Sequence, residues 1–341
     1  MARAKIQDVA RLAGVSLSTV SAVLNNKNVV REATRLRVLE AIERLHYRPD
    51  HYARNLARRS LRVIGVIVSN LQNPFFAETA QVIENEAERL GYAVSLAVTN
   101  FSPQRLRAAV QQMLGARISG LAIMTSERDE MAFDMAAQSG VRCVYLDVGK
   151  PGPASTNIRV DLRGGMMAAV KHLIDIGHRD LLFVRNAPIQ SGPLLLSHRY
   201  RDQGFAAAVK ACGIPNLQTH IIDVPGLGAP AGEEAISRAL GRFPFTAVIA
   251  VSDIVALGVY LGLQQRGVRI PQEVSVVGFD NTNFSRFLNP PLTTVDIPRD
   301  KLSRLVIEAL TLPISSRVPR SVRLGTHLVV RASTASPARR S

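Results

Sequence analysis

The sequence predicts two architectures in one chain: an all-α helix-turn-helix headpiece at the N-terminus, followed by an α/β core of two Rossmann-like subdomains. Residues 1–60 carry the apolar spacing of short helices, whereas from Arg62 onward short apolar runs alternate with amphipathic stretches. The length of 341 residues suits two or three domains, and 47% hydrophobic residues exclude a disordered chain.

Composition restricts the class of protein further. No stretch approaches the roughly 18 consecutive apolar residues of a membrane helix, and the charged N-terminus is not followed by the apolar run of a signal peptide. Cys143 and Cys212 are far apart and neither belongs to a Cys-x-x-Cys pair, so neither a disulfide framework nor a cysteine-based zinc site is expected. We therefore expect a cytoplasmic protein without a membrane partner.

The positive charge is concentrated at the N-terminus. The formal net charge is +15, of which +7 lies in residues 1–60 and +8 in the other 281 residues. A basic module attracts polyanions, but a basic surface is by itself as often only solvated. The spacing of apolar and polar residues within 1–60 therefore has to distinguish a binding module from a solvated basic surface.

Two short helices joined by a glycine turn are predicted first. Gly14 can adopt the left-handed conformation that ends a helix, and Ser16 can cap the next one. The first helix has its apolar stripe at Ile6, Val9, Ala10 and Ala13. The second is expected to bury Val20, Val23 and Leu24, and to face outward with Leu17, Ser18, Ser21 and Ala22.

A third helix is predicted at about 31–45. It would begin at Arg31 without a side-chain cap and bury Leu36, Leu39, Ile42 and Leu45. Two helices joined by a glycine turn and braced by a third form a helix-turn-helix, whose second helix enters the DNA major groove. On this pattern alone, a small three-helix bundle without such a role is the alternative.

Residues 6–25, IQDVARLAGVSLSTVSAVLN, resemble the headpiece of the lactose-repressor/galactose-repressor (LacI/GalR) family of bacterial transcription regulators. Tyr47-Arg-Pro-Asp50 followed by Ala53-Arg-Asn-Leu-Ala57 looks like the hinge helix of that family. The resemblance implies a helix-turn-helix domain at 1–46 and a hinge at 47–60 that orders on DNA. It also implies DNA-contacting roles for Ser16, Leu17, Ser18, Thr19, Ser21, Ala22, Asn25, Tyr47, Arg54 and Leu56.

Within that implied set, the side chains divide by role. Positions 17, 18 and 22 would read base edges, the hydroxyl and amide side chains would hold phosphates, and Leu56 would wedge into the minor groove. Family members usually carry a long polar residue where this chain has Ala22. Because Ala22 and Leu17 cannot donate a hydrogen bond, we expect weak direct readout and greater dependence on Leu56 and DNA shape. Selection of a guanine-rich half-site would contradict this expectation.

The remaining residues predict parallel sheets. Apolar runs at 63–68, 93–98, 121–124, 142–146, 181–184, 220–224, 247–251 and 274–279 alternate with helical patterns at 74–90, 103–115, 129–139, 162–176, 198–212, 231–242 and 253–266. Eight strands exceed one ordinary doubly wound sheet, and the arrangement resembles the periplasmic-binding-protein-like core of the same family. We expect an N-terminal subdomain at 61–163 and 295–326, a C-terminal subdomain at 164–294 and 327–335, and a disordered tail at 336–341. The segment 292–298 is expected to return to the first subdomain.

Ligands of such folds bind at the carboxyl ends of strands, between the lobes. The resemblance implies effector-binding roles for Phe75, Phe76, Asp161, Arg201, Asp253 and Asp280. Carboxylates and a guanidinium suit adjacent hydroxyls, and a phenyl ring can stack on a sugar, so the expected effector is a sugar or sugar derivative. Singly, each residue has a structural alternative: a helix cap for either Asp161 or Asp253, core for Phe75, and a surface ion pair for Arg201.

The pocket also departs from the commonest pattern of the family. Asn281 replaces a second acid, Leu162 stands where a polar or aromatic residue is frequent, and the loop 185–197 is idiosyncratic. Arg128, Arg159 and Arg185 lie near strand ends and would suit an acidic sugar or a phosphorylated metabolite. Binding of a purine base alone would contradict the sugar hypothesis.

Other signals are weaker. Residues 225–232, PGLGAPAG, have the wrong glycine spacing and two prolines for a dinucleotide loop, so we interpret them as a turn. No histidine pair has metal-binding spacing, no cofactor is expected, and His178 is interpreted as structural. The polar C-terminus at 333–341 is expected to fray. It lacks leucine heptads, which favours a homodimer over a tetramer.

The prediction is a ligand-responsive repressor of carbohydrate-metabolism genes that binds operator DNA and is not an enzyme. One alternative is a solute-binding protein without a regulatory role. Another is an enzyme acting on sugars, if Asp161 and Asp280 form an acid/base pair. A third keeps DNA binding but uses a co-repressor or a phosphocarrier protein as effector.

Overall fold

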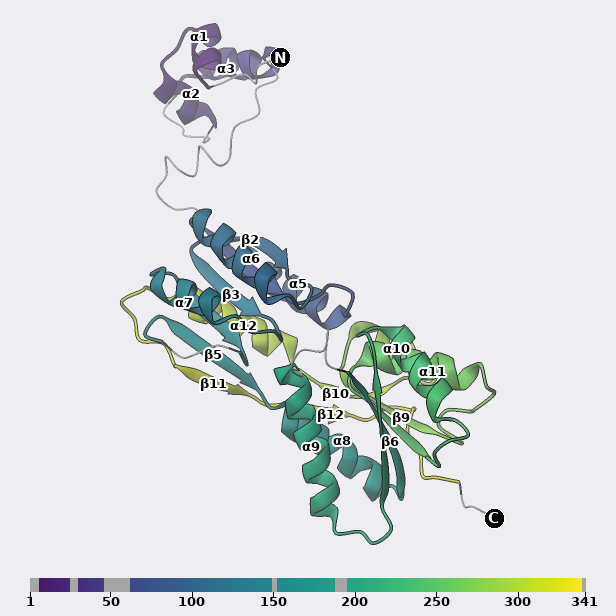
Figure 1. Ribbon diagram of the computed structural model, residues 1–341. Coiled ribbons are helices and arrows are strands. Elements are labelled where there is room, and N and C mark those ends of the chain that lie inside the picture. Colours follow the sequence, from purple (N-terminus) through teal and green to yellow (C-terminus); the bar gives the residue numbers. More distant parts are fainter. Residues whose placement is uncertain (1–5, 25–29, 46–61, 149–151, 188–194, 339–341) are drawn as a thin grey trace. The chain divides into compact units, whose positions relative to one another are not determined.

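The computed structural model describes residues 6–24, 30–45, 62–148, 152–187 and 195–338 (Figure 1). The chain divides into two compact units, residues 1–61 and residues 62–341. We call the described part of the first unit the headpiece and the second unit the core, and each is described by itself. No helix among these residues is long and apolar enough to cross a membrane.

The headpiece consists of three helices, α1 (Ile6–Ala13), α2 (Leu17–Leu24) and α3 (Glu32–Arg44), as predicted. Gly14 has a φ of +61° and ends α1. The Ser16 hydroxyl accepts a hydrogen bond of 3.2 Å from the Thr19 amide and so caps α2. Arg31 begins α3 without a side-chain cap hydrogen bond, which also agrees with the prediction. The predicted hinge at 47–60 lies outside the described residues.

The buried face of α3 differs from the prediction. Leu36 and Leu39 are 59% and 47% exposed, whereas Val38 and Ala41 are buried against α1 and α2. Both sets of residues have helical spacing, so periodicity could not choose between them. The small side chains of Val38 and Ala41 suit the close approach of three short helices.

The core contains two sheets of six strands each, which confirms the predicted fold class. The first sheet has the order β11-β5-β4-β3-β1-β2, and its strands are parallel. Their bounds are β1 Val63–Val68, β2 Ala93–Val98, β3 Gly120–Met124, β4 Arg142–Leu146, β5 Ser155–Val160 and β11 Ser321–Leu324. Helices α5 (Pro74–Arg89) and α12 (Arg299–Thr311) cover one face, and α6 (Pro103–Gly115) and α7 (Glu130–Gln138) the other; we call this the first lobe.

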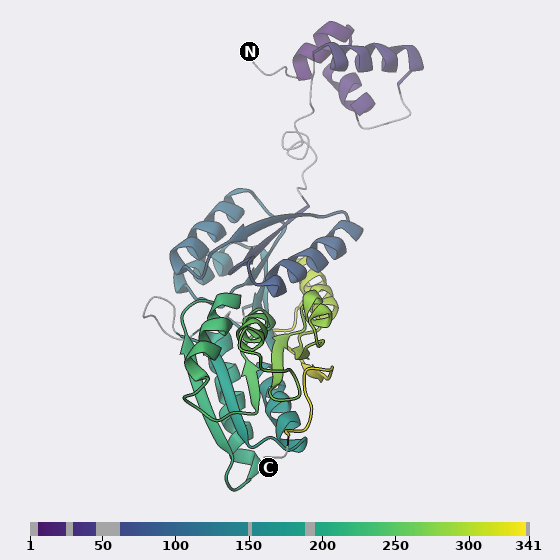
Figure 2. The same cartoon turned by 90° about the vertical axis from the view of Figure 1, so that its right-hand side faces the viewer.

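The second sheet has the order β12-β10-β9-β8-β6-β7 and is parallel except for the β10–β12 pair. Its strands are β6 Asp180–Asn186, β7 Gln218–Val224, β8 Ala247–Ala250, β9 Ser275–Asp280, β10 Thr293–Asp296 and β12 His327–Val329. Helices α8 (Leu162–Asp175) and α9 (Leu196–Cys212) pack together, as do α10 (Ala229–Ala239) and α11 (Asp253–Gln264). With the short 3-10 helix Asn283–Phe287 they complete the second lobe, which lies below the first in Figure 2.

All eight predicted strands and seven predicted core helices are present, but four strands and α12 were not anticipated. Strands β5 and β10 are rich in polar residues, so they lack the apolar run by which a buried strand is recognised. The segment 292–298 was expected in the first lobe, yet β10 pairs with β9 in the second. The chain returns to the first lobe only after Asp296.

The C-terminal segment is partly docked, which corrects the expectation that it frays from Ser333 onward. Ser333 is fully buried, and its hydroxyl donates to the Val276 carbonyl at 2.6 Å and accepts from the Thr293 amide at 2.7 Å.

His178 is structural, as predicted, because its ring nitrogens contact Thr246 Oγ1 at 2.8 Å and Ser275 Oγ at 3.0 Å. Residues 339–341 lie outside the described residues.

Candidate functional site

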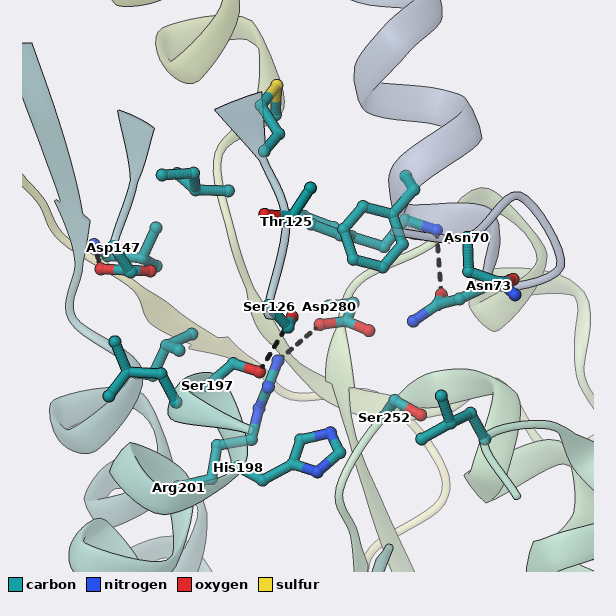
Figure 3. A pocket seen from close by; sticks show the side chains of 18 of the residues that line it. Asn70, Asn73, Thr125, Ser126, Asp147, Ser197, His198, Arg201, Ser252 and Asp280 are labelled. Atoms are coloured by element: carbon teal, nitrogen blue, oxygen red, sulfur yellow. Dashed lines mark hydrogen bonds and ion pairs between the residues drawn. The ribbon is translucent and has the colours of Figure 1, made fainter. Parts of the chain in front are cut away.

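A pocket lies where the carboxyl ends of strands from both lobes meet (Figure 3). The first lobe supplies Phe75 and Phe76 at the start of α5, together with the segments that follow β1, β3 and β4. The second lobe supplies one end of α9 and the residues that end β8 and β9. The labelled polar side chains are Asn70, Asn73, Thr125, Ser126, Asp147, Ser197, His198, Arg201, Ser252 and Asp280.

An ion pair forms the most buried polar part of this pocket. Arg201 Nη2 donates to Asp280 Oδ1 at 3.0 Å, and the two residues are only 7% and 2% exposed. The guanidinium also lies 4.2 Å from the centroid of the Phe279 ring. Arg201 Nε is buried without a hydrogen-bond partner among the described residues. Buried donors are normally satisfied, so this unpaired nitrogen is an exception among the described residues.

The Asp280 carboxylate is held by an unusual backbone conformation. Asp280 has a φ of +112°, a region that L-residues seldom adopt and that concentrates at functional sites. Burial raises the pKa of Asp280 to about 6, while the neighbouring Arg201 opposes that rise. The Phe75 and Phe76 rings stand edge to face, 5.4 Å apart, and belong to the first lobe's side of the pocket.

A second carboxylate, Asp147, lines the pocket and was not among the predicted residues. It follows β4, has a φ of +63°, and its Oδ1 accepts a hydrogen bond of 2.9 Å from the Val160 amide. Burial raises the pKa of Asp147 to about 7, although the charge of Arg201 opposes this. An acid directly after the apolar run 142–146 was the signal that could have found it.

His198 is a further lining residue that the sequence did not single out. Burial, with the nearby charge of Arg201, lowers its pKa to about 3, so the imidazole is neutral. Its Nδ1 is buried and has no hydrogen-bond partner in the described part of the chain. Two residues that line the pocket, His198 and Arg201, thus each carry a buried nitrogen without a hydrogen-bond partner among the described residues.

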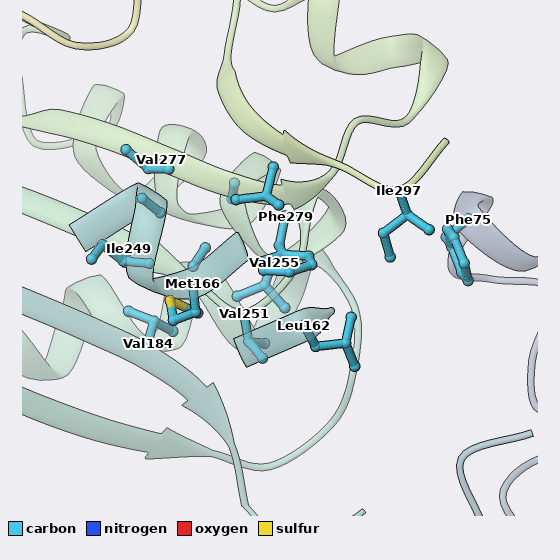
Figure 4. Packing of buried hydrophobic residues seen from close by; sticks show 14 of the residues in the cluster. Phe75, Leu162, Met166, Val184, Ile249, Val251, Val255, Val277, Phe279 and Ile297 are labelled. Carbon is cyan, nitrogen blue, oxygen red and sulfur yellow. The ribbon is translucent and has the colours of Figure 1, made fainter. Parts of the chain in front are cut away.

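The two lobes also contact each other at this pocket. The hydroxyls of Ser126, in the first lobe, and Ser197, in the second, are 3.3 Å apart. The apolar lining is continuous with the main core cluster, which Figure 4 shows around Phe75, Leu162, Val251 and Ile297. A ligand here would therefore have polar groups from both lobes and an apolar surface to pack against.

Of the six predicted effector residues, Phe75, Phe76, Arg201 and Asp280 line the pocket, whereas Asp161 and Asp253 do not. Asp161 caps α8 by accepting from the Gly164 amide at 3.1 Å. Asp253 is fully buried. Its Oδ2 accepts from the Thr282 amide at 2.7 Å and from the Thr282 hydroxyl at 2.9 Å. Its Oδ1 accepts from Thr294 at 2.5 Å.

The three arginines expected near an acidic ligand are not among the lining residues either. Arg185 pairs with both Asp202 and Asp223, and Arg128 pairs with Glu130. Arg159 is an exposed residue of β5. Strand ends are numerous in this fold, so a position near one does not by itself bring a side chain into the pocket.

The outer face of α2 is the second candidate site. Leu17 is 46% exposed, Ser18 and Ser21 are exposed, and Ala22 is half-buried. Ser16 Oγ lies 2.8 Å from the hydroxyls of both Ser18 and Thr19. Hydroxyls beside the first amides of a helix suit phosphate oxygens. The other predicted DNA contacts, Asn25, Tyr47, Arg54 and Leu56, lie outside the described residues.

Comparison with known proteins identifies the family. Residues 5–50 match the model described as bacterial regulatory proteins, lacI family, and residues 170–334 match a periplasmic binding protein-like domain. The HTH-type transcriptional repressor PurR of Photobacterium profundum is 33% identical over 333 residues, which cover 97% of this chain and 98% of that protein. The chain belongs to the lacI family. It is a ligand-responsive, DNA-binding transcriptional repressor.

Solved structures of three transcriptional regulators match nearly the whole chain. The lac repressor dimer bound to operator and the anti-inducer ONPF has a TM-score of 0.78 at 29% identity, covering 98% of this chain and all of that one. The complex of the transcriptional regulator CelR with cellobiose has a TM-score of 0.67 at 28% identity, covering 97% and 100%. A lacI-family regulator from Silicibacter pomeroyi has a TM-score of 0.79 at 26% identity, covering 97% and 99%.

Proposed function

We propose that this lacI-family repressor controls carbohydrate-metabolism genes and that a small, neutral sugar or sugar derivative in the pocket switches its operator affinity. The observation that carries the proposal is the buried Arg201–Asp280 pair with its unsatisfied Arg201 Nε. A guanidinium and a carboxylate side by side offer both donors and acceptors to adjacent hydroxyls. The Phe75 and Phe76 rings supply the apolar surface on which a sugar ring packs.

A neutral effector fits the charges better than an acidic one. The positive charge of Arg201 is already balanced by Asp280, and Asp147 adds a second carboxyl group. Arg128, Arg159 and Arg185 do not line the described pocket. Neutral sugars are also the ligands named for two relatives: cellobiose for CelR, and ribose for a lacI-family regulator from Enterococcus faecium with 26% identity.

On DNA, we propose a homodimer that places two α2 helices on a pseudo-palindromic operator. The outward face of α2 would read bases through Leu17, Ser18 and Ala22, while Ser16, Thr19, Ser21 and Asn25 would hold phosphates. Tyr47, Arg54 and the Leu56 wedge would act from the hinge, and kinking by Leu56 would compensate for the short apolar readers. The lac repressor relative is a dimer on its operator, which supports this arrangement.

The same reasoning gives the remaining proposals. The domains are 1–46, the hinge 47–60, and two subdomains that exchange the chain near residues 163, 295 and 326. A DNA-bound repressor of bacterial genes works in the cytoplasm.

The enzyme alternative required Asp161 and Asp280 to act as an acid/base pair. Asp161 instead caps α8 and pairs with Arg323 at 2.8 Å, so we propose that the protein is not an enzyme.

The experiment combines operator selection with ligand titration. Full-length protein is used to select binding sites from random DNA, and ribose, cellobiose, glucose and a purine base are titrated by calorimetry with and without the selected operator. We expect one palindromic site and at least one sugar that changes operator affinity. Binding of the purine base alone would overturn the sugar assignment, and no preference for any DNA sequence would overturn the regulatory role.

A matched deletion separates the solute-binding alternative. Removal of residues 1–60 should abolish operator binding and leave sugar affinity unchanged, because the core is a separate compact unit. The direction in which ligand changes operator affinity distinguishes an inducer from a co-repressor, since a ligand favours the lobe geometry that it binds better.

A further inference from the structure

A second contact between the lobes involves residues that do not line the effector pocket. Glu78, on α5 of the first lobe, accepts at Oε1 a hydrogen bond of 2.8 Å from the backbone amide of Asn283 in the second lobe. Its Oε2 lies 3.4 Å from Nη2 of Arg299, where α12 begins. The side chains of Glu78 and Arg299 are only 17% and 14% exposed, so solvent screens this ion pair weakly.

Arg299 also holds the turn that presents the effector carboxylate. Its Nη1 donates to the Asp280 carbonyl at 2.7 Å, and its Nη2 donates to the Asn281 carbonyl at 2.6 Å. Asp280 and Asn281 both have positive φ, at +112° and +50°. A non-glycine backbone in this region persists only where surrounding groups hold it. The Arg299 guanidinium is such a group.

The far side of the same turn is fixed within the second lobe. The Asn281 side chain donates to Asp296 Oδ1 at 2.7 Å and accepts from Arg331 Nη2 at 2.6 Å. Asn281 therefore cannot move without breaking contacts on both sides. The turn is thus rigid within the second lobe, and two residues connect it to the first lobe: Arg299 on α12, and Glu78 on α5 through the Asn283 amide.

We propose that Glu78 and Arg299 are positioning residues that set the spacing between the two walls of the effector pocket. Phe75 and Phe76 belong to the first turn of α5, and Glu78 follows Phe76 by two residues, so a contact at Glu78 positions the aromatic side of the pocket. Arg299 pairs with Glu78 and also donates to the Asp280 carbonyl, so it connects Glu78 to the residue whose carboxylate forms the opposite side of the pocket. The pair thus biases the core toward the lobe arrangement in which an effector touches both walls. The ligand part of this inference rests on the proposed function, whereas the lobe spacing does not.

The chemistry of the Glu78 contacts separates two variants. Glu78→Gln keeps an oxygen that can accept from the Asn283 amide but leaves Arg299 without a counter-charge. Glu78→Ala removes both contacts. We therefore expect Glu78→Ala to have the larger effect and Glu78→Gln an intermediate one. Glu88→Ala is the matched control, because Glu88 is an exposed residue of the same helix.

The lobe spacing can be measured without any ligand. Spin labels at Gln111→Cys on α6 and Gln265→Cys after α11, both exposed positions, report the distance between lobes in full-length protein carrying Cys212→Ala. Cys143 can stay, because it is buried and burial raises the pKa of its thiol to about 12. We expect one narrow distance population with Glu78 or with the Glu88→Ala control. A second population should appear in Glu78→Ala and, at lower occupancy, in Glu78→Gln.

Calorimetric titration of the same proteins with ribose and cellobiose tests the link to the site. For a sugar that binds the parent protein, Glu78→Ala should weaken affinity by about 10-fold, with a melting temperature close to that of the control. Unchanged distances in Glu78→Ala, or a changed distance with unchanged sugar affinity, would overturn the positioning role. If neither sugar binds the parent, the distance measurement alone decides whether the contact at Glu78 sets the spacing.

Discussion

Replacement of Arg201 by methionine should destabilise the core in a strongly pH-dependent way. Methionine keeps an apolar stem against Phe279 but removes the guanidinium that pairs with Asp280 at 3.0 Å. With Arg201 present, Asp280 is fully buried and its pKa is about 6. Without that cation, the pKa of Asp280 should rise further, because nothing offsets the loss of hydration to the same degree.

The sign follows from proton linkage. A carboxyl group whose folded pKa lies above its unfolded value of about 3.9 makes folding less favourable as pH rises. In the parent, this loss stops growing above about pH 6, where Asp280 has ionised. In Arg201→Met, Asp280 stays protonated to higher pH in the folded state, so the loss of stability continues above pH 6. The difference in free energy of unfolding between parent and variant should therefore grow by about 1.4 kcal/mol per pH unit until Asp280 of the variant ionises. The pH-dependent part of the difference should be small at pH 5.5, about 1 kcal/mol at pH 7 and about 2 to 3 kcal/mol at pH 8.

Urea denaturation at pH 5.5, 7 and 8 measures this difference. Arg199→Met, an exposed arginine on the same helix, is the matched control and should show no such slope. The double variant Arg201→Met with Asp280→Asn removes the Asp280 carboxyl and should reduce the slope, leaving only the smaller part that comes from Asp147, whose pKa Arg201 also holds down. A destabilisation by Arg201→Met that is equal at all three pH values would refute the reasoning, as would a double variant whose slope is as steep as that of Arg201→Met.

Three further predictions concern single contacts. Leu56→Ala should lower operator affinity far more than sugar affinity, and equal losses in binding assays would contradict its role as a DNA wedge. Ser16→Ala removes the hydroxyl that accepts from the Thr19 amide and caps α2, so it should destabilise the headpiece by about 1 kcal/mol and weaken operator binding. Thermal denaturation followed by circular dichroism measures the stability, and an unchanged melting curve would disprove the cap. Asp253→Ala leaves the buried Thr282 donors unpaired and should destabilise the core by about 3 kcal/mol in urea, and a loss below about 0.5 kcal/mol would show that this contact is dispensable.

The sequence determined the local elements and the family. The helices of the headpiece and eight strands of the core could be predicted because each is encoded by contiguous periodicity, by a glycine with positive φ such as Gly14, or by a cap such as Ser16. Arg201 and Asp280 were found for a related reason. Each stands in a motif that resembles the family's, and Asp280 directly follows an apolar strand.

Only the tertiary structure decided which faces and side chains are used. Leu36 and Val38 both fit a helical stripe, and packing against α1 and α2 selected Val38. Asp147 and Asp161 both follow strands, yet the first lines the pocket and the second caps a helix. The spacing of residues along a chain specifies the conformation of a segment. Which surface the segment meets depends on partners distant in sequence, and burial, ion pairing and pKa shifts arise only once those partners are in place.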